Sequence, residues 1–424
     1  RRSVPTVVMA TIDLATVGGV GDGVTSNTKL IKAMISLIAA AGGGSLLVQG
    51  EKSRFLTGPF NLTSNMRLIV SKGATLLGST ELSEWPLIAP LPSYGQGRDH
   101  AGPRRASLVH GFNLRNVSIS GGGIIDGQGA FWWGRHNAPH AEKFTRGHLI
   151  ELVSSRQIEI ANLTLINSPF WTVHPAFCKD VHAHHLTILN PRDSPNTDGI
   201  DPDSTSDVVL HDNYISTGDD CHAIKSGWDA SGYQTGVPSR NISIYDTFCE
   251  TRAAAVCIGS EMSGGVENVR AWNLLIANTY AAFRIKTAIG RGGLVRNISL
   301  ENSHVRDCDL AFWFDEFYGQ HPSAGFDPTA LPKVMNVFAR GIHGNVRNLT
   351  AMLRGLPVKP DSPFAMQGLI FENVSVSGGW QCENVSGNAT GTPGACECLA
   401  QVNSTWCGPS SVPIAAGGVA AAAF

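Results

Sequence analysis

Charged residues are scarce in this sequence. Asp, Glu, Lys and Arg together make up 16% of its 424 residues, against about 25% in an ordinary soluble protein. Neither sign is in excess, because 32 Lys and Arg stand against 34 Asp and Glu, which leaves a net charge of −2. These values exclude a protein that holds nucleic acid through bulk positive charge, so no nucleic-acid partner is expected.

Long apolar runs are also missing. The longest candidate, Leu30 to Ala41, is interrupted by Lys32 and Ser36, whereas a membrane-spanning helix needs roughly 20 apolar residues. No membrane span is therefore expected. Residue 1 is Arg and no apolar leader follows it, so we expect a processed chain that is secreted to the extracellular space or a cell wall.

Asn-x-Ser/Thr sequons support secretion and predict surface glycosylation. There are ten of them, at Asn61, Asn116, Asn162, Asn241, Asn297, Asn348, Asn373, Asn384, Asn388 and Asn403. Asn-rich turns produce some sequons by chance, and the sequence does not show which of them carry glycan.

Four of the nine cysteines gather near the C-terminus, at Cys382, Cys396, Cys398 and Cys407. In an oxidising compartment this cluster predicts a local disulfide-bonded cap. A zinc site is the weaker interpretation, because two C-x-x-C pairs are missing and no His lies nearby. With an odd total, at least one cysteine is free or pairs between molecules.

The most regular feature of the sequence is a repeated turn-and-strand pattern. From about residue 107, a turn residue that is usually Asn or Asp precedes a short alternating apolar strand, again and again. The steps between equivalent apolar positions are 23, 27, 34, 27 and 29 residues, measured along Ile158, Val181, Val208, Ile242, Val269 and Ile298. Such periods with β-branched strands predict a solenoid, and specifically an all-β fold, a parallel β-helix. Its coils would stack about 4.8 Å apart and form an outward groove on one side.

A stack of this kind accounts for the whole chain as one domain, residues 1–424. We expect a body at about 17–379, a disulfide-rich C-terminal cap at 380–407 and a low-complexity tail at 408–424. A helix over Thr25–Ala41 would cover the N-terminal end. Ser26 would cap this helix, Gly42 to Gly44 would end it, and its apolar face would hold Leu30, Met34, Leu37 and Ala41.

The densest polar stretches are NTDGIDPDS from Asn196 and STGDDCHAIKSG from Ser216. Asp198 precedes the Asp219-Asp220 pair by 21 and 22 residues, about one coil, so stacking would bring the three together. Crowded carboxylates cannot all ionise freely, and a raised pKa is what a general acid requires. The alternative is that these Asx-rich turns only bond their own backbone.

Two cations follow within FRIKT, where strand alternation puts Arg284 and Lys286 on one face. Beside carboxylates they suggest an anionic ligand, since Arg clamps a carboxylate and Lys anchors it as a point charge. A surface ion pair is the alternative.

These motifs, with GGIIDGQGAFWWG at residues 122–134, resemble the polygalacturonase family, the family-28 glycoside hydrolases. The resemblance covers most of the chain, and segments such as GDGVTSNT, LTGPFNLTS and IGSEMSGGV are most similar to the plant-type branch. It implies a right-handed parallel β-helix that hydrolyses galacturonate-containing pectin with inversion. Inversion usually needs carboxyl groups about 6.5 to 9.5 Å apart, with water between them.

The resemblance also implies roles for single residues. Asp219 would be the general acid, and Asp198 with Asp220 would hold and activate the water. Asn196 would help to position that group, and Arg284 with Lys286 would bind the galacturonate carboxylate. His174 and Tyr318 match positions near the substrate, and Cys221 with Cys249 matches a family disulfide.

One departure from the family pattern stands in TRAAAVCIGSE, where Ala253 falls at the place of a usual histidine. It suggests a rhamnogalacturonan hydrolase as one alternative. With the odd cysteine and the Ala/Gly-rich tail, it also permits a weak or inactive β-helix that binds cell-wall or matrix glycans. A lyase is the third alternative. Strand alternation places His222 in the bore as a structural residue.

No metal or other cofactor is expected. His184 and His185 lack an acidic partner at ligand spacing, and the calcium pattern of a pectate lyase is missing although Asp201 and Asp203 could bind the ion. The expected partner is an acidic, pectin-type polysaccharide.

Overall fold

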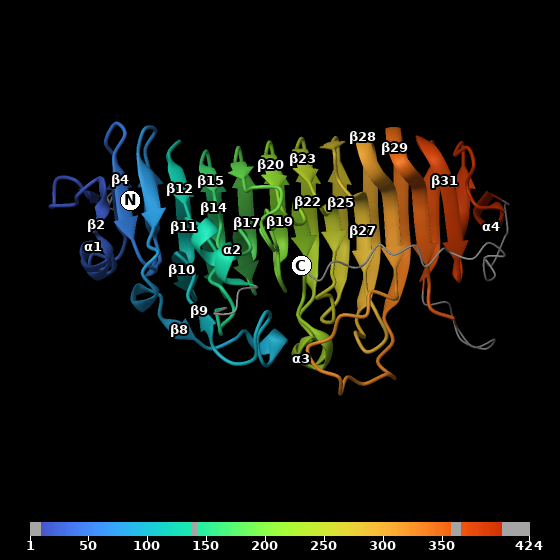
Figure 1. Ribbon diagram of the computed structural model, residues 1–424, viewed down its shortest axis with the longest axis horizontal. Coiled ribbons are helices and arrows are strands. Elements are labelled where there is room, and N and C mark those ends of the chain that lie inside the picture. Colours follow the sequence, from blue (N-terminus) through green and yellow to red (C-terminus); the bar gives the residue numbers. More distant parts are fainter. Residues whose placement is uncertain (1–9, 137–141, 358–365, 401–424) are drawn as a thin grey trace, which may run out of the picture.

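The chain folds into a parallel β-helix, in which short strands stack coil upon coil along the long axis of the molecule (Figure 1). The computed structural model describes residues 10–136, 142–357 and 366–400. This architecture confirms the predicted all-β solenoid. No helix within the described ranges is long and apolar enough to cross a membrane.

Three ladders of parallel strands run along the body. The first contains β1 (Thr11–Asp13), β3 (Gly44–Val48), β6 (Met66–Val70), β11 (Arg115–Ser120), β14 (Arg156–Ala161), β17 (Lys179–His184), β19 (Ser206–His211), β22 (Ser239–Tyr245), β25 (Val266–Trp272), β30 (Met366–Glu372) and β32 (Val385–Thr390). The second contains β2 (Asp22–Ser26), β4 (Arg54–Thr57), β7 (Thr75–Gly78), β12 (Ile124–Asp126), β15 (Thr164–Ile166), β18 (Thr187–Leu189), β20 (Tyr214–Thr217), β23 (Phe248–Thr251) and β26 (Leu275–Ala277).

The third ladder carries the chemistry described below. It contains β5 (Phe60–Asn61), β10 (Val109–Phe112), β13 (Ile150–Val153), β16 (Val173–Ala176), β21 (His222–Ile224), β24 (Ala254–Ile258) and β27 (Ala281–Lys286). Towards the C-terminus longer strands serve more than one ladder, namely β28 (Leu294–Asp315), β29 (Lys333–Arg354) and β31 (Ser375–Glu383).

The remaining elements lie outside the ladders. They are the strand pair β8 (Leu87–Ile88) and β9 (Arg104–Arg105), the helices α1 (Thr28–Ala40), α2 (Ala130–His136), α3 (Asp229–Thr235) and α4 (Glu397–Ala400), and the short 3₁₀ turns η1 (Leu82–Glu84) and η2 (Pro92–Tyr94).

The repeat predicted from the sequence is the stacking register of the first ladder. Each of its apolar positions pairs with the next one, in the order Ile158, Val181, Val208, Ile242, Val269 and Ile298. All six side chains are buried in the bore. Although the steps differ in length, each apolar residue occupies the same position in its coil, because the extra residues form loops between the strands.

The recurring turn residue has a backbone cause. Asp207, Asn241, Asn268 and Asn297 stack on one another with φ of 57° or 58°, the left-handed region that Asn and Asp tolerate best. Their side chains also bond along the stack, with Asn241 Nδ2 donating to Asp207 Oδ1 at 2.9 Å and Asn297 Nδ2 to Asn268 Oδ1 at 2.9 Å. This ladder explains why the sequence marks each coil with Asn or Asp.

Both ends differ in detail from the expectation. Helix α1 covers the first coils (Figure 1), but its buried face holds Ile31, Ile35 and Ile38, whereas Leu37 is exposed. The predicted face was therefore wrong by one position, because Leu30 and Ile31 are both apolar and the sequence pattern does not choose between them. At the other end the coils continue past residue 379 to β32.

A core substitution tests the register. Ile242→Ala should lower the free energy of unfolding by about 2–5 kcal/mol, because the side chain is buried between its stacking partners Val208 and Val269. Ser243→Ala, on the next residue with its side chain half-buried, is the matched control and should cost under about 1 kcal/mol. Denaturant unfolding of both variants measures the difference, and equal losses would contradict the register.

Candidate active site

Three carboxylates meet on the outer side of the third ladder. Asp198 stands two residues before Ile200, which bridges to β16 on one side and β21 on the other. Asp219 and Asp220 lie before β21, separated from it only by Cys221, and Gly199 N donates to Asp220 O at 2.9 Å. One oxygen from each of the three residues lies within 4.8 Å of the others. Stacking thus brings together the carboxylates that the sequence separates by a coil.

Two lysines balance this negative charge. Lys286 Nζ lies 2.7 Å from Asp220 Oδ2, and Lys225 Nζ lies 3.5 Å from Asp198 Oδ2 and 3.4 Å from Glu261 Oε2. All five side chains are buried, so these charges act on one another with little screening.

The charges divide the carboxylates into two kinds. Burial would raise the pKa of Asp220, but the adjacent charges of Lys286 and Arg284 outweigh it and hold the pKa below the usual aspartate value. Burial and the charge of Asp220 raise the pKa of Asp219 above the usual aspartate value. Burial and the charge of Asp219 raise the pKa of Asp198 well above the same usual value. Asp220 is therefore the carboxyl that ionises most readily, whereas Asp198 and Asp219 both release their protons at higher pH than an ordinary aspartate.

The three carboxylates also differ in solvent exposure. Asp219 is half-buried, whereas Asp198 and Asp220 are 3% and 0% exposed. The Asp219 backbone is held by hydroxyls, since Thr217 Oγ1 donates to its carbonyl at 2.7 Å and Thr251 Oγ1 donates to the same atom. Of the two carboxyls with a raised pKa, Asp219 is thus the one that can reach a ligand from outside.

The expected uronate ligands form an aromatic-lined group beside the triad. The Arg284 guanidinium lies 3.8 Å from the ring centroid of Trp313 and 5.5 Å from that of Tyr318. Lys286 Nζ lies 5.6 Å from the centroid of Tyr318. Arg284 is half-buried, so part of its edge can bind an anion while its face stacks. The structure therefore brings Arg284, Lys286 and Tyr318 together.

Asn196 and His174 lie differently. Asn196 is buried, and its Oδ1 accepts from Arg146 Nη2 at 2.8 Å. This contact supports a positioning role for Asn196 near Asp198. His174 is 1% exposed, with its Nδ1 3.1 Å from Glu151 Oε1 and its Nε2 3.2 Å from Asp203 Oδ2. This position does not support the predicted substrate contact of His174, because both ring nitrogens have partners inside the protein.

The alanine that faces the acidic cluster is Ala254, one residue beyond the expected Ala253. Ala254 N donates to Asp220 Oδ1 at 2.8 Å, whereas Ala253 N donates to Thr251 Oγ1 at 3.2 Å. His222 does not substitute for the histidine that the family usually has beside the acidic cluster. It is buried in the bore opposite Val256, and burial lowers its pKa to about 4, which confirms its structural interpretation.

Cysteines support the chain next to the triad. Cys221 and Cys249 form a disulfide, the pair that the resemblance implies, and it ties Asp220 to the neighbouring coil. At the C-terminal end Cys382 pairs with Cys396. Cys407 lies outside the described residues. Among the described residues three buried cysteines are free, Cys178, Cys257 and Cys308.

Some residues of the site were missed by the sequence analysis. Lys225 could have been found, because alternation after His222 and Ile224 turns it outward with Ala223. Glu261 and Arg98 gave no signal: Glu261 follows the end of β24, and Arg98 reaches it from a loop more than 160 positions away in sequence, with Nε 2.5 Å from Oε1. Asp201 was weighed only as a calcium ligand, yet it is fully buried near the triad.

Groups of ligand-type side chains within the described ranges give no strong metal site. Lys286 and Lys225 already supply cations to the Asp198, Asp219 and Asp220 group. A second group, His185 with His211 and Asp212, lies at the surface, so His185 does have an acidic neighbour that the sequence spacing did not reveal.

Comparison with known proteins places this fold and site in a family. The model of the glycosyl hydrolases family 28 matches residues 48–396. A probable polygalacturonase of Vitis vinifera is 42% identical over 395 residues, which cover 90% of this chain and 79% of that protein. An endo-polygalacturonase of Pectobacterium carotovorum subsp. carotovorum is 27% identical over 375 residues, which cover 86% of this chain and 88% of the relative.

A solved structure agrees with these sequences. The exopolygalacturonase of Thermotoga maritima superposes with a TM-score of 0.74 at 26% identity, covering 92% of this chain and 93% of the other. The chain therefore belongs to glycosyl hydrolases family 28. It is a glycoside hydrolase of the polygalacturonase-like kind.

Asp201 provides a test of the electrostatics. Its side chain is fully buried, neither carboxylate oxygen has a hydrogen-bond partner among the described residues, and burial with the charge of Asp198 raises its pKa well above the usual value. The folded state therefore binds a proton more tightly than the unfolded state, so this group costs stability as pH rises above the ordinary aspartate pKa. Asp201→Asn removes that cost.

We expect Asp201→Asn to raise the free energy of unfolding by about 1–3 kcal/mol at pH 7 and to have a smaller effect near pH 4. Thermal and denaturant unfolding at both pH values measure it. Asp193→Asn, at an exposed position nearby, is the control and should change stability at neither pH. A loss of stability at pH 7 in Asp201→Asn would contradict the assignment.

Proposed function

We propose that this protein is a secreted hydrolase that cleaves galacturonate-containing pectic polysaccharide with inversion at the anomeric carbon. One observation carries the proposal: a half-buried Asp219 with a raised pKa stands beside the ionised Asp220. An acid and a base with opposite pKa shifts are what glycoside hydrolysis requires. The names of the relatives support the substrate class.

The first step belongs to Asp219. Its carboxylic acid donates a proton to the glycosidic oxygen as the bond from that oxygen to the anomeric carbon breaks, so that the leaving sugar departs as an alcohol. Burial and the charge of Asp220 raise the pKa of Asp219, which favours its protonated form before the reaction. The half-buried position of Asp219 supports this part, because the acid must touch the substrate.

The second step belongs to Asp198 and Asp220. One oxygen of each lies within 4.8 Å of the other and of an oxygen of the acid Asp219, closer than the usual acid-to-base separation in inverting enzymes. A water hydrogen-bonded at about 2.8 Å to both Asp198 and Asp220 can bridge the gap between them. Asp198 Oδ1 has no partner among the described residues and is available to that water. The water attacks the anomeric carbon and gives a proton to the ionised Asp220.

Recognition of the uronate falls to Arg284 and Lys286. Arg284 keeps an edge free of its stacking contact with Trp313, and a guanidinium edge matches a sugar carboxylate. Lys286 already neutralises Asp220, so it serves both the base and the ligand. These local cations allow a chain of net charge −2 to bind a polyanion.

Removing the acid should abolish turnover. We expect Asp219→Asn to lower kcat on polygalacturonate by about 10²- to 10⁴-fold, whereas Asp193→Asn should behave like the wild type. Release of reducing ends measures both. Equal activity of Asp219→Asn and wild type would disprove the role of Asp219, and binding of pectin without any turnover by the wild type would favour a glycan-binding protein instead.

The stereochemical part of the proposal needs its own measurement. Proton NMR of a fresh digest distinguishes the anomer released first from the one formed later by mutarotation. Inversion of the α-linkage gives β first, and initial appearance of α would show retention, which the proposed water between Asp198 and Asp220 does not allow.

Secretion can be tested through the sequons. Asn61 and Asn348 are exposed, whereas Asn384 is buried, so glycan should occupy the first two and be absent from Asn384. Peptide mass spectrometry of protein secreted from a eukaryotic host, after enzymatic deglycosylation in heavy-oxygen water, reports each site. Unmodified Asn61 and Asn348 would contradict the expectation.

A further inference from the structure

The outer side of the third ladder is covered on one side of the triad and accessible on the other. One outward row runs through Glu151 and His174 on the coils before the triad and through Asp201 on the coil of Asp198, and these side chains are 0%, 1% and 0% exposed. Large polar side chains reach such values only when something lies over them. On the other side of the triad Arg284, Trp313 and Met352, in the same register, are half-buried.

The cover is the segment from residue 89 to residue 105, which we call the wall loop. Its Leu91 and Tyr94 pack into a separate apolar cluster with Val153, Phe170, Trp171, Ala176 and Trp228. Val153 and Ala176 belong to β13 and β16, so the loop is seated directly on the outer side of those strands. In Figure 1 this segment runs below the stack from β8 towards α3.

Polar contacts fix the wall loop at several points. Tyr94 Oη donates to Asp203 Oδ2 at 2.6 Å, and Gln96 Nε2 donates to Pro322 O at 2.6 Å. The backbone N–H of Trp228, at the start of α3, donates to Ser93 O at 2.9 Å. Together with Arg98 on Glu261, these contacts attach the loop both to the strands beneath it and to the loops beyond the triad.

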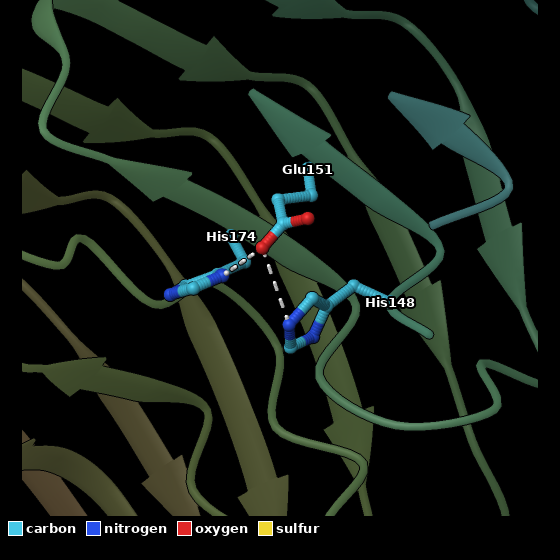
Figure 2. A group of neighbouring side chains, drawn as sticks. All are labelled: His148, Glu151 and His174. Carbon is cyan, nitrogen blue, oxygen red and sulfur yellow. Dashed lines mark hydrogen bonds and ion pairs between the residues drawn. The ribbon is translucent and has the colours of Figure 1, made fainter. Parts of the chain in front are cut away.

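Buried charge anchors the end of the wall loop. Arg104 Nη1 lies 2.8 Å from both oxygens of Glu151. Figure 2 shows Glu151 between His148 and His174, with Oε1 3.4 Å and 3.1 Å from their ring nitrogens. Because Arg104 supplies the cation at this carboxylate, the cluster acts as an anchor for the loop rather than as a metal site.

The covered coil is the immediate neighbour of the triad. Thr172 N donates to Asp198 O at 2.9 Å, and Trp171, one residue earlier, is part of the apolar cluster under the loop. Adjacent coils are about 4.8 Å apart, so the space between the triad and the wall is on the order of a single sugar unit. A wall at this place leaves little room for a polymer on that side of the triad.

We infer that this protein acts at chain ends: the wall loop stops the polysaccharide about one sugar beyond the triad, so that the enzyme releases one or two sugars at a time. The inference deepens the proposed function and rests on it. The relatives do not decide the question, since both an endo-polygalacturonase and an exopolygalacturonase are similar to this chain.

The product profile of the wild type is the direct test. Chain-end action predicts that mono- or disaccharide is the main product from the first minutes, and that the viscosity of polygalacturonate falls slowly for each reducing end released. Early oligomers with a rapid fall in viscosity would overturn the inference and leave the proposed function intact. No reducing ends from any acidic polysaccharide would overturn both.

Substrates with blocked ends add an independent readout. Oligogalacturonates carrying a bulky label at the reducing end, or an unsaturated uronate at the other end, should differ in rate by at least tenfold, and the resistant one identifies the end that meets the wall. Equal internal cleavage of both substrates would overturn the inference.

Opening the wall should change the products. Tyr94→Ala removes both the packing against Trp171 and the hydrogen bond to Asp203, and we expect the ratio of oligomers to monosaccharide to rise several-fold. Tyr94→Phe keeps the ring and should retain the wild-type profile, which makes it the matched control. Unchanged products from a folded Tyr94→Ala, checked by thermal unfolding, would contradict a wall that depends on this loop, and the wild-type profile remains decisive if that variant does not fold.

Discussion

Hydrogen bonding of each coil to the coil before it, in a fixed register, is the constraint on which the other features of this protein depend. It places every outward side chain at the level of its counterpart on the next coil, about 4.8 Å away. Asp198 and Asp220 become neighbours in this way, although a coil of sequence separates them, and Lys286 reaches Asp220 from a strand two coils further along. The bore positions Val208, Ile242 and Val269 hold that register by burial.

The carboxylates of the site differ in how readily they ionise, because the neighbouring lysines do not contact them equally. Three carboxylates this close would repel one another, and two lysines do not make them equivalent. Lys286 contacts Asp220 directly, whereas Asp219 forms no ion pair within the described part of the chain, and desolvation together with the charge of Asp220 raises its pKa. Removing either partner of a buried pair usually costs far more than the pair contributes, so Asp220 and Lys286 act as one unit that sets the state of the acid.

Much of this could be predicted from sequence, for physical reasons. The apolar repeat gave the strand register because one face of every strand must fill the bore, and the Asn or Asp at each turn reflects a left-handed backbone position. The coil spacing of Asp198 and Asp219 then followed. The position of His174 could not be predicted, because it depends on a loop that folds over β16 from 80 residues earlier in the chain. The face of α1 was shifted since Leu30 and Ile31 are both apolar. Ala254 rather than Ala253 lies against Asp220, which its backbone hydrogen bond shows and the sequence could not.

The central claim is that Asp219 carries the catalytic proton while Asp220 is ionised. Carbon-13 NMR titration of the aspartate carboxyls, in the wild type and in the Asp219→Asn and Asp220→Asn variants, tests it most directly. The account predicts a signal that titrates above the ordinary aspartate range and disappears in Asp219→Asn, and that moves to lower pH in Asp220→Asn because the adjacent negative charge is gone. A wild-type spectrum in which Asp219 titrates below Asp220 would contradict the account.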